Sequence, residues 1–420
     1  ERLIVSLRRD LLKGLMSMGF LSALRPKDAD AKKVANVAGA DLSVLASPYK
    51  GAVVQLVGAN VISPLFDPGY SLEAHLPSLL DPGPSGVPPL KYKSIAPATG
   101  EPWENGRYSC DESLINKLTL SFQFVVTYYG KTVENFHMFM WKGVRMDGLN
   151  VVAGFTDERT EAEALHLWKD EAYLAYGLTS KPLLTYATGL HGWRSAEAGW
   201  RLISSPASKV IWQTSVDIPS YPKGGEPNEA AIVLMVGHAN VDTGRKPLAY
   251  FSAIHTVPMN KELKRKEGET LRQAAMRAAI EKVCAEAGID PRSIRSLASD
   301  CGKGSPEAAK RLADLGAVAH DLMPDIDVLK DRIDMAALLG ELGAHNVTYT
   351  LLMAAYAAHQ RNHPVLYVST RDPDAGRAML VFPPLDHTPP DPNRKFREHN
   401  ARGQWYAPWW GQRLDGKLDY

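Results

Sequence analysis

The sequence predicts a protein of the α/β class. After residue 230, short runs of β-branched and aliphatic residues alternate with amphipathic segments of helical period, which is the pattern of a mixed or parallel sheet covered by helices. Before residue 230, strand-like runs are separated by long proline-rich stretches. A length of 420 residues is sufficient for more than one domain or for one large duplicated fold. We therefore expect a layered α/β C-terminal half, and an α+β N-terminal half with long loops.

Five runs in the N-terminal half have the β-branched and aromatic composition of strands. They span 52–57, 119–129, 149–155, 183–187 and 209–214. A helix is expected over 158–176, because Thr160 and Glu163 have the spacing of a capping box. Prolines throughout 77–106 exclude a continuous helix or a central strand, so this stretch is predicted to be a loop.

A second Pro/Gly-rich stretch, 219–227, is where we place the main boundary. It divides an N-terminal half, 1–230, from a C-terminal half, 231–385. The remaining 386–420 form a tail that is rich in proline and then in aromatic residues.

In the C-terminal half, 231–237 and 248–257 are predicted as buried strands. The helix that follows has the clearest signals, because Thr270 and Gln273 have capping-box spacing and Gly288 can end it. Its apolar stripe, which predicts burial, consists of Met276, Ile280, Val283, Cys284 and Ala287. Cys284 in this stripe is expected to be inert.

Further along, a strand is predicted at 294–298, followed by the loop DCGKGS at 300–305. Ser305 can cap a helix with Pro306 at its first position. Gly316 is expected to end that helix before a short strand at 317–319. The remaining predicted elements are a long apolar helix over 343–360 and a hairpin, 365–369 with 378–382.

Composition and charge exclude several classes of function. Lysine plus arginine number 48 and aspartate plus glutamate 47, a net charge of +1, which argues against nucleic-acid binding. Three cysteines cannot form a disulfide scaffold, and no set of zinc ligands can be assembled. We expect no metal and no cofactor. We also expect a cytoplasmic protein with no membrane span. The apolar segment 3–24, which contains Arg8 and Arg9, is either a core helix or lies just inside an anchor upstream of Glu1.

The residues that could carry chemistry have weak patterns. Cys301 in the DCGKGS loop could be a nucleophile if a base stood nearby, and the alternative is a tight strand–helix turn. No HExxH or GxSxG motif is present. The pair His359 and His363 is an unfavourable metal site, because Pro364 ends the helix there. Several histidines near predicted strand ends could each be a general base: His137, His191, His238 and His255.

Two exposed segments could contact partners. The charged run 261–269, KELKRKEGE, is predicted to be a solvated loop, with a basic interaction patch as the alternative. In the tail, four large aromatic residues lie close together, and aromatic residues of these types often anchor interfaces. They are Trp405, Tyr406, Trp409 and Trp410. We expect them to dock onto the chain itself, with part of the patch left open for a protein partner.

Residues 231–384 resemble the C-terminal half of a thiolase-like, β-ketoacyl-synthase-type fold. The resemblance rests on three motifs and on VVQLVGANVISP at 53–64, which is similar to the first strand of such enzymes. The three motifs are IDPRSIRSLASDCGKGSPE, GELGAHNVTYTLLMAAYAA and LYVSTRDPDAGRAMLVFPP. The family carries a histidine in each of the first two motifs, and a nucleophilic cysteine in its first half.

The sequence departs from that family at each catalytic position. The two histidines would fall near Cys301 and Glu341, and Cys110 is the only cysteine of the first half but lacks matching surroundings. Condensation needs a thiolate and two imidazoles, so the resemblance implies a scaffold without that chemistry. If the protein were an enzyme, Cys301 and Glu341 would be its candidate catalytic residues.

Degenerate chains of this kind resemble proteins associated with type VI secretion, which implies an adaptor that hands a lipase effector to the secretion spike. The alternatives are a thioester-handling enzyme with relocated residues, and a hydrolase with an unrecognised histidine site. A pocket holding Cys301, Glu341 and a histidine, with a tunnel for an acyl chain, would favour the enzyme. A filled site would favour the adaptor.

Overall fold

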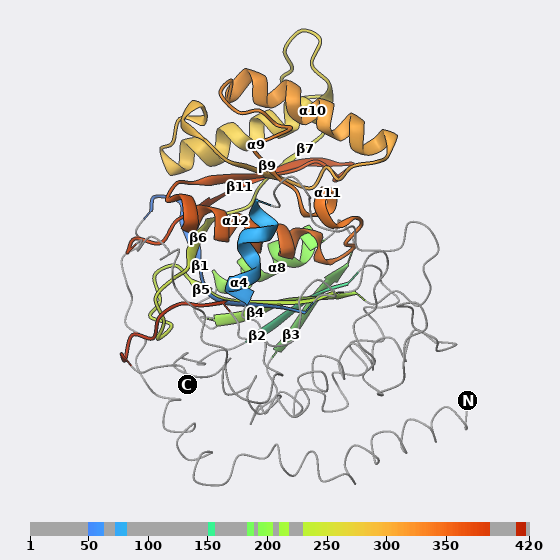
Figure 1. Cartoon of the computed structure of the whole chain (residues 1–420). Coiled ribbons are helices and arrows are strands. Elements are labelled where there is room, and N and C mark those ends of the chain that lie inside the picture. Colours follow the sequence, from blue (N-terminus) through green and yellow to red (C-terminus); the bar gives the residue numbers. More distant parts are fainter. Residues whose placement is uncertain are drawn as a thin grey trace, which may run out of the picture.

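A computed structural model describes residues 49–62, 72–81, 150–155, 183–188, 192–204, 210–217, 230–386 and 409–416 (Figure 1). Several predictions fall on residues outside these ranges. They concern the strand at 119–129, the helix at 158–176, the loop at 219–227, most of the loop at 77–106, and Cys110, His137 and His191. The division of the chain near residue 230 stays a prediction.

The strands of the described residues form one mixed sheet. Its order is β3-β2-β4-β5-β1-β6-β11-β10-β8-β9, with β12 beside β1 and β7 beside β11. The strands are β1 (Ala52–Ile62), β2 (Asn150–Phe155), β3 (Leu183–Thr188), β4 (Val210–Asp217), β5 (Ala230–His238), β6 (Ala249–Ser252), β7 (His255–Pro258), β8 (Leu297–Ser299), β9 (Arg332–Ile333), β10 (Val365–Ser369), β11 (Ala375–Phe382) and β12 (Trp409–Trp410). Neighbours are parallel at β3-β2-β4 and at β10-β8-β9, and antiparallel elsewhere. The predicted α/β class is confirmed.

Helices lie in two layers around this sheet (Figure 1). The outer layer consists of α9 (Leu271–Ala287) and α10 (Pro306–Leu322), and α9 packs on β11. The inner layer lies between the two arms of the sheet and consists of α4 (Leu72–Leu80), α8 (Trp193–Ile203), α11 (Met335–Leu339) and α12 (His345–Arg361). This arrangement gives the layered architecture that the sequence predicted.

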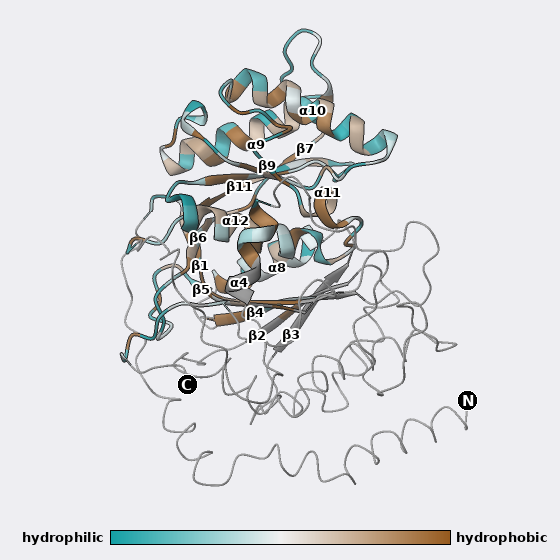
Figure 2. Ribbon diagram, viewed as in Figure 1, coloured by the Kyte–Doolittle hydropathy of each residue, from teal (hydrophilic) through white to brown (hydrophobic). Residues whose placement is uncertain are grey.

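Helix α12 is the centre of the core. It contacts β4 and β5 on one arm of the sheet and β10 and β11 on the other. Every side chain from His345 to Ala358 is buried. A helix that is buried on all sides must be enclosed by other elements, because no face of it is suited to water. Figure 2 shows apolar residues gathered on α12 and on the strands around it.

Helix α9 confirms the prediction from its capping signals. The Thr270 hydroxyl accepts a hydrogen bond from the Gln273 amide at 3.2 Å, and the Gln273 side chain accepts one from the Thr270 amide at 2.9 Å. Gly288 ends the helix with φ of +70°, a left-handed conformation that favours glycine. Met276, Ile280 and Cys284 are completely buried, as the stripe predicted.

The prediction that Gly316 ends a helix is wrong. Helix α10 continues through Gly316 to Leu322, and no strand forms at 317–319. Leu315, Val318 and Ala319 are buried and extend the helical stripe past the glycine. A glycine inside a helix is less favourable than alanine by only about 1 kcal/mol, and the burial of these three side chains offsets that cost.

The predicted loop at 77–106 begins later than expected, because Pro77 lies inside α4. A proline removes one hydrogen bond from a helix. Leu76 and Leu79, on either side of Pro77, are both buried, and α4 packs against α12. That packing holds the short helix together around the exposed proline.

Two predicted strands differ in extent from those observed. The stretch 248–257 divides into β6 and β7, because the Ser252 hydroxyl takes the hydrogen bond of the Leu380 amide at 2.9 Å and interrupts the ladder to β11. The strand predicted at 294–298 is displaced to β8, and a 3₁₀ turn, Pro291–Ser293, precedes it. The other predicted strands within the described ranges are confirmed, as are the helix over 343–360 and the hairpin of β10 and β11.

Replacing Ile280 with alanine tests the burial of α9. We expect Ile280→Ala to lower the free energy of unfolding by roughly 2–5 kcal/mol, because it leaves a cavity under a well-packed helix. Urea denaturation measures this change. Lys282→Ala, at an exposed position of the same helix, is the control and should change stability little. Equal effects of the two substitutions would contradict the placement of α9.

A buried polar cluster as the candidate functional site

The residues singled out by sequence lie where two parallel strands end. Strands β8 and β10 are parallel neighbours, so their carboxyl ends meet at the same edge of the sheet, where α/β proteins commonly place their sites. Asp300 and Cys301 follow β8, and Thr370 and Arg371 follow β10. The DCGKGS loop therefore lies beside the turn of the β10–β11 hairpin.

Asp300 is the centre of this cluster and is completely buried. Its Oδ1 atom accepts hydrogen bonds from the Thr370 amide at 2.6 Å and from the Thr370 hydroxyl at 2.7 Å. Its Oδ2 atom accepts from the indole N–H of Trp193 at 3.0 Å and from the Ser369 hydroxyl at 3.1 Å. An ionised carboxylate has about four acceptor positions. All of them are used, which leaves none for a substrate.

Cys301 is also completely buried. Burial, and after it the charge of the nearby Asp334, raises the pKa of its thiol to about 11. The thiol is therefore protonated at neutral pH, and a protonated, buried thiol is a poor nucleophile. The Cys301 carbonyl accepts a hydrogen bond from Arg311 at 3.0 Å, and the Gly302 amide donates to Asp334 at 3.0 Å. These bonds fit the tight-turn interpretation of the loop.

Glu341 reaches the same cluster through an arginine. Its Oε2 atom lies 2.7 Å from Arg371 Nη1, and its Oε1 atom accepts hydrogen bonds from the amides of Leu342 and Gly343, each at 3.1 Å. Arg371 Nε in turn donates to the Asp300 carbonyl at 2.6 Å. The structure therefore brings Cys301 and Glu341 into one network, in which Arg371 joins their two loops.

Trp193 fills the space at the centre of the cluster. It is the first residue of α8 and is completely buried, and its ring lies 4.7 Å from that of Tyr367 on β10. Gly192 before it has φ of +99°, and a Cβ there would lie 2.7 Å from the Ala344 carbonyl. Only glycine permits this close approach of α8 to the start of α12. The large indole occupies the position between the helices and the strand ends.

Sequence analysis did not single out Asp300, Trp193 or Arg371. Asp300 follows a strand directly and Trp193 follows a glycine at a helix start, so a local signal was present in both cases. These residues meet only because the fold brings together segments that are far apart in the sequence. The Trp193–Asp300 hydrogen bond, for example, joins residues more than one hundred positions apart.

The candidate histidines lie apart from this network or have other partners. His255 Nε2 lies 2.9 Å from a carboxylate oxygen of Glu286, and His238 accepts a hydrogen bond from the Asn240 amide. His359 Nδ1 lies 3.0 Å from the Leu248 carbonyl, and His345 Nδ1 lies 3.1 Å from the Ser215 hydroxyl. Among the residues that the structure describes, no group of three His, Cys, Asp or Glu side chains is placed to hold a metal ion.

The aromatic tail docks in part onto the chain itself. Trp409 is buried, and its ring lies 5.5 Å from that of Tyr356 and 5.6 Å from that of His359, both on α12. Strand β12, which also contains Trp410, pairs with β1. Trp405 and Tyr406 lie outside the described residues.

The segment after β12 is fixed by one glycine and one arginine. Arg245 donates to the Gly411 carbonyl at 2.8 Å, and the Gly411 amide donates to the Val57 carbonyl at 2.9 Å. A Cβ at position 411 would lie 1.8 Å from the Lys246 carbonyl. Only glycine fits there, so the tail packs against β1 in a specific, close backbone contact.

No helix of the described ranges has the length and apolar character needed to cross a membrane.

Residues 248–383 match a family model described as the C-terminal part of the type VI lipase adapter protein Tla3. This stretch runs from just before β6 to just after β11, and it contains Cys301, Glu341 and Arg371. A search of curated proteins found no match.

Solved structures that match include ketosynthases and a 3-oxoacyl-[acyl-carrier-protein] synthase III. The oxazolomycin ketosynthase domain of Streptomyces albus is 13% identical, with 81% of this chain and 98% of that chain covered and a TM-score of 0.48. The ishigamide ketosynthase/chain length factor is 14% identical, with 79% and 99% covered and a TM-score of 0.49. The 3-oxoacyl-[acyl-carrier-protein] synthase III of Aquifex aeolicus is 12% identical, with 78% and 99% covered and a TM-score of 0.41.

Removing the central carboxylate tests the cluster. Asp300→Ala should lower the free energy of unfolding by more than about 3 kcal/mol, because each buried donor left without its acceptor costs about 1–3 kcal/mol. Chemical denaturation measures the loss, with Asp374→Ala in the exposed part of the neighbouring turn as control. A stability loss no larger than that of the control would show that Asp300 is not the structural centre.

Thiol labelling tests whether the site is closed. In a Cys110→Ser background, iodoacetamide at neutral pH should modify neither Cys284 nor Cys301 until the chain is unfolded. Burial raises the pKa of Cys284 to about 12 and that of Cys301 to about 11, so any labelling should increase as the pH rises. Mass spectrometry of the labelled peptides gives the rates. Labelling of Cys301 at the rate of a free thiol would contradict a closed site.

Proposed function

We propose that this protein is a non-catalytic adaptor of type VI secretion that binds a lipase effector. The match of residues 248–383 to a type VI lipase adapter model supports the adaptor role. The observation that carries the proposal is the filled cluster at the ends of β8 and β10. Trp193, Asp300 and Cys301 are all completely buried there.

The chemistry of that cluster argues against the enzyme alternative. Nucleophilic catalysis needs an ionisable nucleophile, a base within reach and room for a substrate. Cys301 has a raised pKa and no exposed surface. The Asp300 carboxylate is occupied by four hydrogen bonds. Glu341 is occupied by Arg371 and by two amides. These groups join segments of the chain instead of facing a ligand.

A fold of this kind suits a binding role. Hydrogen bonds from Arg371 join the loops of Asp300 and Glu341, and such preorganisation lowers the entropic cost of presenting a surface to a partner. We propose that handing the lipase to a spike protein is the second half of the role, and that the encounter takes place in the cytoplasm. The aromatic side chains Trp405, Tyr406 and Trp410 are proposed contacts with protein partners, while Trp409 anchors the tail.

Affinity capture tests the adaptor role. The full chain, immobilised through a terminal tag, is incubated with a lysate of the source organism, and bound proteins are identified by mass spectrometry. A lipase should be enriched relative to an unrelated bait, and the purified pair should co-migrate in size-exclusion chromatography. Absence of any lipase from the enriched proteins, with the bait folded, would contradict the proposal.

A further inference from the structure

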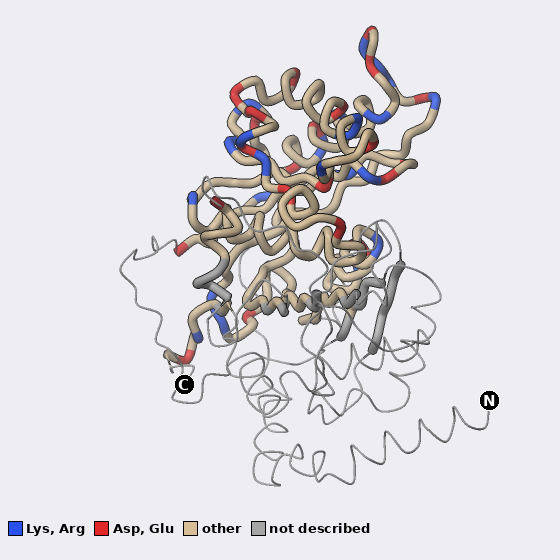
Figure 3. The backbone as a smooth tube through the Cα atoms, turned by 45° about the vertical axis from the view of Figure 1, so that its right-hand side comes forward, with Lys and Arg blue, Asp and Glu red and all other residues tan. Residues whose placement is uncertain are grey.

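A charged loop projects from the outer layer of the molecule. It spans 259–269, connects β7 to α9, and extends beyond the helices (Figures 1 and 3). We call it the β7–α9 loop. Connections in compact domains are typically about 4–6 residues long. This loop is longer, and most of its side chains are exposed.

A nearly buried ion pair holds the base of this loop in one shape. Glu269 accepts hydrogen bonds from Arg277 Nε and Nη2, each at 2.8 Å, and from the Lys266 amide, also at 2.8 Å. Arg277 also donates to the Lys264 carbonyl at 3.1 Å. The side chains of Arg277 and Glu269 are 12% and 9% exposed. Such two-pronged pairing of arginine with a carboxylate fixes geometry as well as charge.

Pairing favours the charged forms of both Glu269 and Arg277. The hydrogen bonds from Arg277 hold the pKa of Glu269 below its usual value, and those to Glu269 raise the pKa of Arg277. Lys266 pairs with Asp321 of α10, which ties the loop to the neighbouring helix as well. The loop is therefore ordered before any partner arrives.

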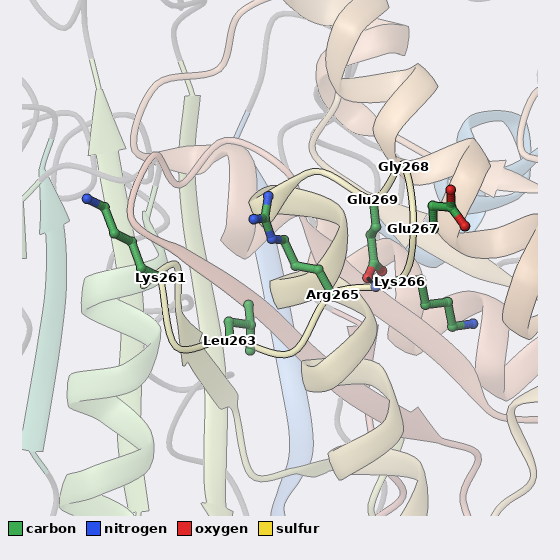
Figure 4. A pocket seen from close by; sticks show the side chains of 7 residues that line it. All are labelled: Lys261, Leu263, Arg265, Lys266, Glu267, Gly268 and Glu269. Atoms are coloured by element: carbon green, nitrogen blue, oxygen red, sulfur yellow. Dashed lines mark hydrogen bonds between the residues drawn. The ribbon is translucent and has the colours of Figure 1, made fainter.

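The side chains at the tip are left without partners. The side chains of Lys261, Lys264 and Arg265 form no hydrogen bond or ion pair within the part of the chain that the structure describes, and neither do the side chains of Glu262 and Glu267. Seven residues of the loop line a shallow hollow that is open to solvent (Figure 4). Figure 4 shows Arg265 extending toward the part of the loop that carries Leu263 and Lys261, Lys261 extending outward from the loop, and Glu267 pointing to the opposite side.

We propose that the β7–α9 loop is the docking point for an acidic segment of the lipase, with partner carboxylates on Lys261 and on Arg265 and an apolar neighbour on Leu263. This inference rests on the proposed function. A guanidinium binds a carboxylate through two parallel hydrogen bonds, and Leu263 adds an apolar contact that an isolated anion would not use. The carboxylates of Glu262 and Glu267 beside these cations disfavour a polyanionic backbone such as nucleic acid.

The test measures binding of the purified lipase to variants of the full chain by surface plasmon resonance. Lys261→Glu with Arg265→Glu should slow association by about tenfold or more at low ionic strength, because opposed charges no longer steer the encounter. The matched control reverses two exposed lysines on another part of the surface, Lys303→Glu with Lys310→Glu, and should bind within about twofold of wild type. Poly-L-glutamate should compete with the lipase, and poly-L-lysine should not.

The outcomes separate the two proposals. All variants should melt at the wild-type temperature, because the altered side chains are exposed, so loss of binding cannot be attributed to unfolding. If the wild-type chain binds the lipase and the loop variant binds equally well, or if the control loses as much affinity, the loop proposal is overturned and the adaptor role stands. If the wild-type chain does not bind the lipase, the adaptor role fails, and the loop proposal fails with it.

Discussion

The carboxylate of Asp300 is the constraint on which the rest of the structure depends. Four hydrogen bonds join it to the start of α8 and to the end of β10, and the carbonyl of the same residue accepts a fifth from Arg371. These contacts connect segments on both sides of α12. A buried charge is tolerated only where its hydrogen bonds are complete. The free-energy cost of burying Asp300 is therefore offset only when its own loop, the start of α8 and the end of β10 are all in place.

This requirement explains why the candidate site is closed. The residues that donate hydrogen bonds to Asp300 also pack closely around it, chiefly through the buried indole of Trp193. Arg371 then connects the loop of Asp300 to that of Glu341. In the proposed account, the strand ends of an α/β fold have become a structural joint, and contact with partners is left to the outer loops and the tail. A fold by itself does not determine function, and here the side chains at the site argue for binding over catalysis.

Much of the fold could be predicted from the sequence, because its signals are local. The capping box at Thr270, the left-handed Gly288 and the all-apolar run of α12 each depend on neighbours within one or two turns. The errors arose where tertiary packing overrides local preference. Gly316 is carried through α10 by the buried residues that follow it, and Pro77 is held in α4 by leucines packed near α12.

The candidate site was less predictable than the fold. Cys301 and Glu341 were singled out through their motifs, and the structure joins their loops through Arg371; their role as a site stays a prediction. Their actual partners could not be foreseen, because Trp193, Asp300 and Arg371 come from three distant segments. Hydrogen bonds between such segments depend on how the sheet brings their ends together. The hydrophobic periodicity of the sequence reports only local structure and cannot predict these bonds.

Native-state hydrogen exchange is the most direct measurement of the central claim that this site is permanently closed. The amides of Thr370 and Gly302 donate to the carboxylates of Asp300 and Asp334. If the cluster is a structural joint, both should exchange only through global unfolding, with the same free energy as core amides of α12, whether or not lipase or an acyl thioester is added. Rapid exchange by local opening, or protection that changes when the thioester is added, would show a site that opens to a ligand and would contradict the account.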